Sequence, residues 1–173
     1  MKKILIIGAG AMGAAFSIPL IENGHHVTLS EPHNIKLISK LNLKNKFHPS
    51  LKINLPKKIK TKKFVPEMLN LQWDLIVVAV SSVGIEIISK YLAHLKSKTP
   101  ILVLTKGLKL DKTKRIITMS EQLNRNNNKL NISVLKGPCL AKELARKIKS
   151  YTVIGNKNIK IAKDIGKIIS TKY

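Results

Sequence analysis

The chain has 173 residues, of which 44% are hydrophobic and 24% are charged. This length fits one domain, and the hydrophobic content excludes a chain that is disordered throughout. Lysine and arginine number 32 against nine acidic residues, which gives a net charge of +23. All but three of the basic residues are lysines, and aromatic residues make up only 4%. This pattern indicates compositional drift and argues against nucleic-acid binding, which prefers arginine forks and aromatic platforms.

The single cysteine excludes an internal disulfide and favours a reducing compartment. Residues 4–21 are apolar, but glycines and Pro19 interrupt them. We therefore expect neither a membrane span nor a cleaved leader there, and we predict a cytoplasmic protein without a membrane partner.

Aliphatic runs alternate with segments of helical spacing along the whole chain. The runs predict strands at 2–7, 26–30, 75–80, 101–104, 131–135 and 151–154, and the less regular stretch at 41–72 predicts a weak strand near 58–64. The spacing predicts helices at 12–23, 33–40, 66–71, 83–95, 112–124, 138–147 and 158–169. This alternation predicts an α/β fold, a doubly wound and mostly parallel Rossmann sheet with helices on both faces, over residues 1–173. Ligands of such sheets bind beyond the carboxyl ends of the strands.

The GAGAMG stretch lies between the first predicted strand and the first predicted helix, which is the context that a dinucleotide fingerprint requires. Gly8 permits a tight turn, Gly10 lets a diphosphate approach the backbone, and Gly13 allows the helix to pack closely on the strand. The N–H groups of Ala11 and Met12 stand at the helix start, where an anion is favoured. The sequence therefore predicts an NAD or NADP site, with a purely structural turn as the alternative.

Glu31 follows the second strand, 18 residues after the last glycine of the loop. A carboxylate at about this distance accepts hydrogen bonds from the adenosine ribose and repels a 2′-phosphate. Glu31 therefore favours NAD over NADP, although a merely solvated carboxylate beside Pro32 is an open alternative. Nearby lysines such as Lys36 weaken the preference.

Other candidate residues follow later strands. Ser81 and Ser82 either allow close approach of a cofactor or cap the next helix. Lys106 stands beside a glycine over the predicted crevice, where an ammonium group can hold an anionic substrate. Gly137 gives close backbone access, and Cys139 lies near a helix start and lysines, conditions that favour a thiolate. No histidine accompanies Cys139, so we interpret it as a packing or ligand-contact residue, and the histidines show no metal spacing.

With these residues identified, the chain resembles the amino-terminal half of NAD(P)-dependent sn-glycerol-3-phosphate dehydrogenase. The resemblance rests on GAGAMG, GHHV at 24–27, HPSLKINLP at 48–56, LIVVAVSS at 75–82, TKGL at 105–108 and GPCLAKELA at 137–145. The last two motifs are the most specific to the family. The chain departs from the family pattern at Met12, where an aromatic residue is common, and at Cys139, where serine or threonine is usual. It also lacks a proline after the helix that carries Glu143.

The resemblance implies an oxidoreductase that interconverts dihydroxyacetone phosphate and glycerol 3-phosphate for glycerophospholipid synthesis. It implies cofactor contacts at Ala11, Met12, Lys106 and Ala141, and substrate contacts at Lys106, Gly137 and Cys139. The family's catalytic residues lie in a carboxy-terminal helical domain, which we expect to be absent from this chain. We therefore expect a truncated, inactive cofactor domain with no catalytic residue and no metal.

The full-length protein can be a homodimer. Two alternatives for the class of protein stay open at this point. The chain can belong to another class of Rossmann reductase, of the ketopantoate-reductase type. It can also be a basic, non-catalytic module that binds nucleotides or nucleic acids through its net charge.

Overall fold

The computed structural model describes residues 1–95 and 97–173, and within them seven strands form one sheet in the order β11-β10-β7-β6-β1-β2-β5. These strands are β1 Lys3–Ile7, β2 His26–Glu31, β5 Lys60–Lys63, β6 Leu75–Val78, β7 Ile101–Val103, β10 Ile132–Lys136 and β11 Val153–Gly155. Neighbouring strands run parallel, except that β11 is antiparallel to β10. The order proceeds outward from β1 in both directions and confirms the predicted doubly wound fold.

Helices cover both faces of the sheet. They are α1 Ala11–Glu22, α2 Ile35–Leu41, the 3₁₀ helix η1 Pro66–Asn70, α3 Ile85–Leu92, α4 Met119–Asn124, α5 Ala141–Ala145 and α6 Ile159–Ile169. Ile4 and Ile6 of β1 pack on the face that α1, α2, α5 and α6 cover. Leu5 and Ile7 pack on the face that η1, α3 and α4 cover. Both faces of β1 are therefore buried, which explains its uninterrupted aliphatic sequence.

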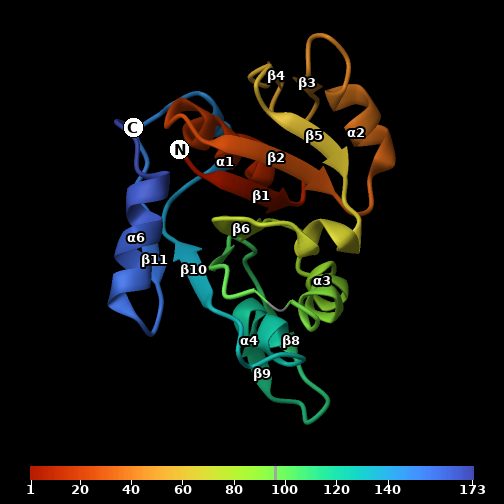
Figure 1. Cartoon of the computed structure of the whole chain (residues 1–173), viewed down its shortest axis with the longest axis vertical. Coiled ribbons are helices and arrows are strands. Elements are labelled where there is room, and N and C mark those ends of the chain that lie inside the picture. The colour runs from red at the N-terminus through yellow and green to blue at the C-terminus, as the bar shows by residue number, and fades with distance from the viewer. Residues whose placement is uncertain (96) are drawn as a thin grey trace.

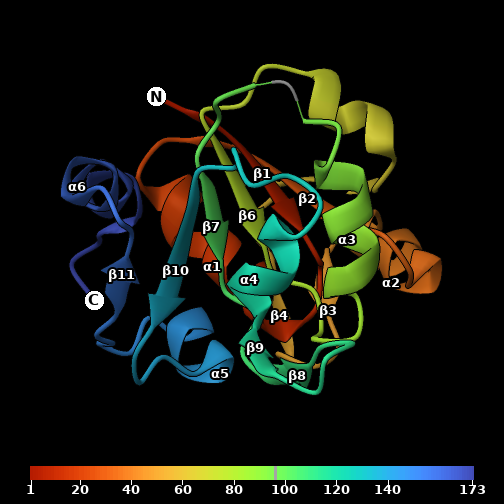
Figure 2. The same cartoon turned by 90° about the horizontal axis from the view of Figure 1, so that it is seen from below.

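The two halves of the fold extend to opposite edges of the sheet. Figure 1 shows β11 and α6 beside β10 at one edge, and β5 with α2 at the other. Figure 2 shows α3 and α4 side by side, next to the hairpin of β8 Leu108–Leu110 and β9 Ile116–Thr118. A second small hairpin, β3 Phe47–His48 with β4 Ile53–Asn54, lies near α2. The sequence patterns predict neither hairpin, because their strands are only two or three residues long.

The predicted helix at 112–124 is wrong in its first half, which forms the turn of the β8–β9 hairpin and the strand β9. The Asp111 carboxylate accepts hydrogen bonds from the backbone N–H groups of Thr113 and Arg115 and stabilises the hairpin turn. Lys114 in this turn has a φ of +60°, a conformation that no helix contains. The helix begins only at Met119, after Thr118 caps it.

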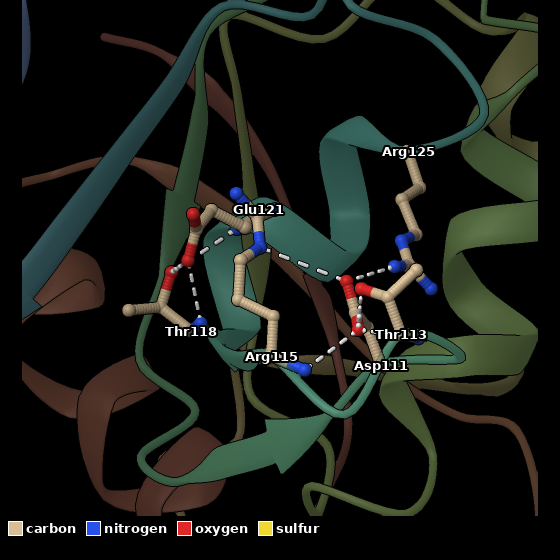
Figure 3. A network of polar contacts seen from close by, with 6 residues as sticks. All are labelled: Asp111, Thr113, Arg115, Thr118, Glu121 and Arg125. Atoms are coloured by element: carbon tan, nitrogen blue, oxygen red, sulfur yellow. Dashed lines mark hydrogen bonds and ion pairs between the residues drawn. The ribbon is translucent and has the colours of Figure 1, made fainter.

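Figure 3 shows the polar network that joins this hairpin to α4. Asp111 forms ion pairs with Arg115 and Arg125, at 3.6 and 2.9 Å. Thr118 and Glu121 form a reciprocal capping box at the start of α4. The hairpin and the helix are therefore held in one arrangement beside α3.

The predicted helix at 138–147 is also longer than the observed α5. Leu140 has an extended backbone, with φ −96° and ψ 136°, so the helix cannot begin before Ala141. Pro138 therefore stands before the helix, whereas the sequence predicts it in the first turn. The chain reverses instead through a tight turn in which the Cys139 N–H donates to the Gly137 carbonyl at 3.0 Å.

Candidate functional site

The glycine loop connects β1 to α1 under severe steric limits. Gly8 has a φ of +110°, and a Cβ atom added there would lie 2.6 Å from the carbonyl carbon and oxygen of Ala79. A Cβ atom on Gly13 would lie 1.9 Å from the carbonyl oxygen of Gly8. These two glycines therefore allow the loop to turn against β6 and α1 to pack against the loop.

Gly10 differs from its neighbours because space is open above it. Apart from Gly10 itself and the residues on either side of it, the described chain places no heavy atom within 4 Å of a Cβ atom added to Gly10. Gly10 is the N-cap of α1, and within the described chain no side chain caps this helix end. The first-turn N–H groups of Ala11 and Met12 are therefore available to an anion, and the helix dipole favours one. The loop thus fits the diphosphate of a dinucleotide.

The Glu31 carboxylate is directed inward against the protein backbone. One oxygen, Oε2, accepts the Ala9 N–H at 2.8 Å, and Oε1 accepts the N–H groups of His33 and Asn34 at 3.0 and 3.1 Å. The residue is only 8% exposed. Glu31 therefore joins the glycine loop to the segment that starts α2, a role that its position in the sequence does not reveal.

His48 forms a hydrogen bond with the backbone carbonyl of Ala9, the residue whose N–H donates to Glu31. Its Nε2 atom lies 2.9 Å from the Ala9 carbonyl oxygen, and the residue is 1% exposed. Sequence reasoning missed this contact, because a single histidine far from the loop gives no signal of its partner. The only hint is the HPS stretch, which is typical of a turn.

A cavity of about 280 Å³ lies beside the loop, at the carboxyl ends of the central strands. It is lined by Met12, Ala79, Val80, Ser81, Ser82, Leu104, Thr105, Lys106, Cys139, Leu140 and Ala141. The structure therefore brings together residues that the sequence places more than a hundred positions apart. These include Met12, Lys106, Cys139 and Ala141, which were all predicted to contact cofactor or substrate.

The strand ends that form the cavity are joined by Thr105. Its hydroxyl donates a hydrogen bond to the Val80 carbonyl at 2.7 Å, and the residue is buried. The next residue, Lys106, is exposed and lines the cavity. The Ser81 hydroxyl accepts the Gly84 N–H at 3.4 Å in the turn before α3. The N-cap of α3 is Gly84 and no side chain of the described residues caps this helix, so the capping alternative for Ser81 and Ser82 is wrong, and both serines line the cavity.

Cys139 lines the cavity but does not favour the thiolate that its sequence neighbours suggest. Burial raises the pKa of the thiol, and the charge of Lys106 opposes this effect only in part. The neutral thiol therefore dominates, in keeping with a packing or contact residue.

Gly137 lies outside the residues that line this cavity. Its φ is +117°, and an added Cβ atom would lie 2.8 Å from the Tyr151 carbonyl oxygen. The position therefore requires glycine for the approach of the chain before β11. The predicted substrate contact of Gly137 stays a prediction.

A larger cavity of about 510 Å³ lies between α1, β11 and α6, and Cys139 borders it too. None of the glycine-loop residues lines it, and most of its lining is apolar. We therefore place the candidate site at the smaller cavity, next to the uncapped helix end.

Two further features concern the described residues, 1–95 and 97–173. They contain no group of three or more histidine, cysteine or acidic side chains arranged to hold a metal ion. Each helix among them is too short or too polar to cross a bilayer.

The sheet order, the glycine loop and the adjoining cavity define an α/β domain of the Rossmann class. The family model described as "NAD-dependent glycerol-3-phosphate dehydrogenase N-terminus" matches residues 3–162. The chain therefore belongs to this family, which confirms the resemblance seen in the sequence motifs and displaces the ketopantoate-reductase alternative.

Individual relatives agree with this assignment. A glycerol-3-phosphate dehydrogenase [NAD(P)+] of Bacillus pumilus is 31% identical over 94% of this chain and 47% of that protein. An NADP(+)-dependent glycerol-3-phosphate dehydrogenase of Archaeoglobus fulgidus is 28% identical over 98% of this chain and 51% of that protein. The crystal structure of the Coxiella burnetii glycerol-3-phosphate dehydrogenase shares the fold, with a TM-score of 0.83, 22% identity, and coverage of 99% of this chain and 51% of that one. The chain thus spans about half the length of these relatives.

Proposed function

We propose that this chain is the cofactor-binding domain of an oxidoreductase that interconverts dihydroxyacetone phosphate and sn-glycerol 3-phosphate with NAD or NADP, for glycerophospholipid synthesis. One observation carries the proposal. The open space above Gly10 adjoins the uncapped start of α1, beside a cavity that Lys106 lines. Family membership supports the substrate and the cofactor class.

Each residue of the site has a defined part in this proposal. The N–H groups of Ala11 and Met12 bind the diphosphate, and Ala141 contacts the nicotinamide end of the cofactor. Lys106 supplies a positive charge that holds the substrate and stabilises negative charge on its reacting oxygen. Gly137 and Cys139 stand on the substrate side. The cofactor itself supplies the hydride when it is bound, and the protein orients it and excludes water.

We propose a modest preference for NAD over NADP, because the Glu31 carboxylate stands at the end of β2, where a 2′-phosphate would approach. The N–H groups of Ala9, His33 and Asn34 already neutralise part of this charge. The expected discrimination is therefore small, about three- to tenfold in affinity. Parallel titrations with NADH and NADPH measure it.

The acid–base chemistry of the reaction is assigned to a second, helical domain, as the resemblance implies. We therefore propose that residues 1–173 alone bind cofactor without appreciable turnover of dihydroxyacetone phosphate. We also propose that the protein is cytoplasmic and that the full-length enzyme is a homodimer. Substantial turnover by the 173-residue chain alone would contradict the division of labour between domains.

The central test is cofactor binding by a Gly10→Val variant. The φ of Gly10 is −62°, which valine tolerates, and a Cβ atom there contacts no described residue beyond the two adjacent ones, so we expect the fold to be retained. The added side chain occupies the diphosphate space, and the Kd for NADH rises by about 100-fold or more, which corresponds to ~2.7 kcal/mol. NADH fluorescence titration measures the affinity, and urea unfolding verifies that stability changes by less than about 1 kcal/mol.

A Gly166→Ala variant serves as the control, since it adds a Cβ atom in α6 with only an ordinary contact to Ile154 at 3.9 Å. Its NADH affinity equals that of the wild type. Absence of saturable NADH binding in the wild-type chain would refute the proposed function.

A further inference from the structure

We propose that His48 is a positioning residue for the diphosphate loop, acting through the backbone of Ala9. The inference rests on the proposed cofactor site and adds to it a residue from a distant hairpin. Ala9 stands between Gly8 and Gly10, and its own side chain is fully buried. The two polar groups of its backbone are both held by buried side chains from outside the loop.

The contacts fix two successive peptide units of the loop. The Ala9 N–H donates to Glu31 Oε2 at 2.8 Å, which fixes the peptide between Gly8 and Ala9. The Ala9 carbonyl lies 2.9 Å from His48 Nε2, which fixes the peptide between Ala9 and Gly10. The peptide bonds of the described chain are trans. In a planar trans peptide the N–H points opposite to the carbonyl, so the His48 contact also sets the direction of the Gly10 N–H.

The tautomer of His48 follows from its neighbours. The Leu51 N–H lies 3.3 Å from Nδ1, and a backbone N–H can only donate. Nδ1 is therefore the acceptor of a neutral ring, and the proton is on Nε2, directed at the Ala9 carbonyl. The two ring contacts hold the imidazole, and the backbone that carries it is closed into a turn by a hydrogen bond from the Lys52 N–H to the His48 carbonyl, at 2.9 Å.

The consequence concerns anion binding. The Gly10 N–H adjoins the open space at the start of α1, where the diphosphate is proposed to bind. An amide that is already oriented binds an anion without the entropy loss of ordering the loop. The β3–β4 hairpin, which carries His48, therefore contributes to cofactor affinity without touching the cofactor.

Three variants test the proposal by NADH titration, with the folded fraction determined by urea unfolding. His48→Phe removes the donor and raises the Kd for NADH about tenfold. His48→Gln restores an N–H donor close to the Nε2 position and returns the Kd to within about threefold of the wild type. Leu51→Ala removes buried packing from the same hairpin but keeps both hydrogen bonds of His48, and its Kd also stays within about threefold.

A spectroscopic readout keeps the test independent of how well the variants fold. Nitrogen-15 spectra of the wild-type imidazole are expected to identify His48 as the Nε2–H tautomer, with and without NADH. An Nδ1–H tautomer would overturn the proposal, as would a folded His48→Phe variant with wild-type affinity, or an equal loss in Leu51→Ala. Failure of the wild-type chain to bind NADH would instead refute the cofactor site itself.

Discussion

At Gly8, a single added methyl group would lie 2.6 Å from the backbone of Ala79, at a φ of +110° that other residues avoid. At Gly10, the same group would meet nothing and enter the proposed ligand space. The fingerprint therefore combines glycines that the fold requires with one, Gly10, that the packing does not require. The sequence predicts this division, since the motif appears between a strand and a helix.

The division leads to a prediction for Gly8→Ala. The clash with Ala79 and the strained backbone are expected to lower the free energy of unfolding by ~2–4 kcal/mol. Equilibrium urea unfolding measures the change, with Gly10→Val as the matched control that keeps wild-type stability. An equally stable Gly8→Ala protein would show that the loop can move away from β6.

The contacts of Glu31 and His48 could not be predicted from the sequence around each residue. The spacing from the glycine loop predicts Glu31 at the end of β2, and the structure has it there. The spacing cannot reveal that the side chain is turned inward, because that depends on the loop and α2 closing around it. For His48, its partner Ala9 is 39 residues away, and no local pattern encodes such a contact.

At the scale of elements, the β8–β9 hairpin turns at Asp111, a usual turn residue, without the glycine, proline or asparagine that would mark the turn more clearly. The stretch from Lys112 to Thr118 contains no glycine, proline or asparagine, so its apolar spacing resembles a helix. The Asp111 carboxylate provides the turn by accepting backbone N–H groups across it. By contrast, the central parallel strands β1, β6 and β7 were predictable, because each lies in a short aliphatic run.

This turn has a testable dependence on pH. Hydrogen bonds from Thr113, with the N–H of Arg115 and the charge of Arg125, lower the pKa of Asp111 from 3.8 to about 2. Because the folded-state pKa is depressed, the stabilisation is fully present above pH 3.8 and is lost as the pH falls through about 2. The backbone amide shifts of Thr113 and Arg115 are expected to titrate with a midpoint near this lower value.

Asp111→Asn provides the control for this titration. The variant keeps a side-chain oxygen for the turn but loses the charge that faces Arg115 and Arg125. Its amides are expected to show no titration in this range. A midpoint near the ordinary value in the wild type would mean that the network in Figure 3 does not persist in solution.

At the scale of the whole molecule, the net charge of +23 has a physical effect of its own. Like charges repel across the surface and destabilise the compact state, while the same field attracts anions. The fold itself was predictable at this scale, because the alternation of strands and helices leaves few topologies. The antiparallel direction of β11 was not, since a three-residue strand carries no directional signal.

Added salt is expected to act on stability and binding in opposite directions. Raising the ionic strength from ~0.02 to ~0.5 M screens the lysines and raises the Tm by ~2–4 °C. The same change weakens NADH binding, because the positive field that attracts the dinucleotide is screened. Thermal unfolding and fluorescence titration over one salt series measure both effects.

The salt series also distinguishes the nucleic-acid alternative. Binding to short DNA or RNA that persists above physiological salt would mean that the lysines form a functional surface. Binding that disappears in that range leaves the excess charge as a feature of composition.

The inward-facing carboxylate of Glu31, the last residue of β2, has a consequence for attempts to redesign coenzyme choice. An acidic residue at this position of the fold distinguishes a free ribose 2′-hydroxyl from a 2′-phosphate, so its exchange is the obvious route to a phosphorylated coenzyme. Here the two Glu31 oxygens accept hydrogen bonds from Ala9 and from Asn34 at the start of α2. Replacing Glu31 would therefore also remove a contact that orders the loop proposed to bind either coenzyme. A successful redesign would have to provide another acceptor for the N–H groups of Ala9 and Asn34 before it alters selectivity.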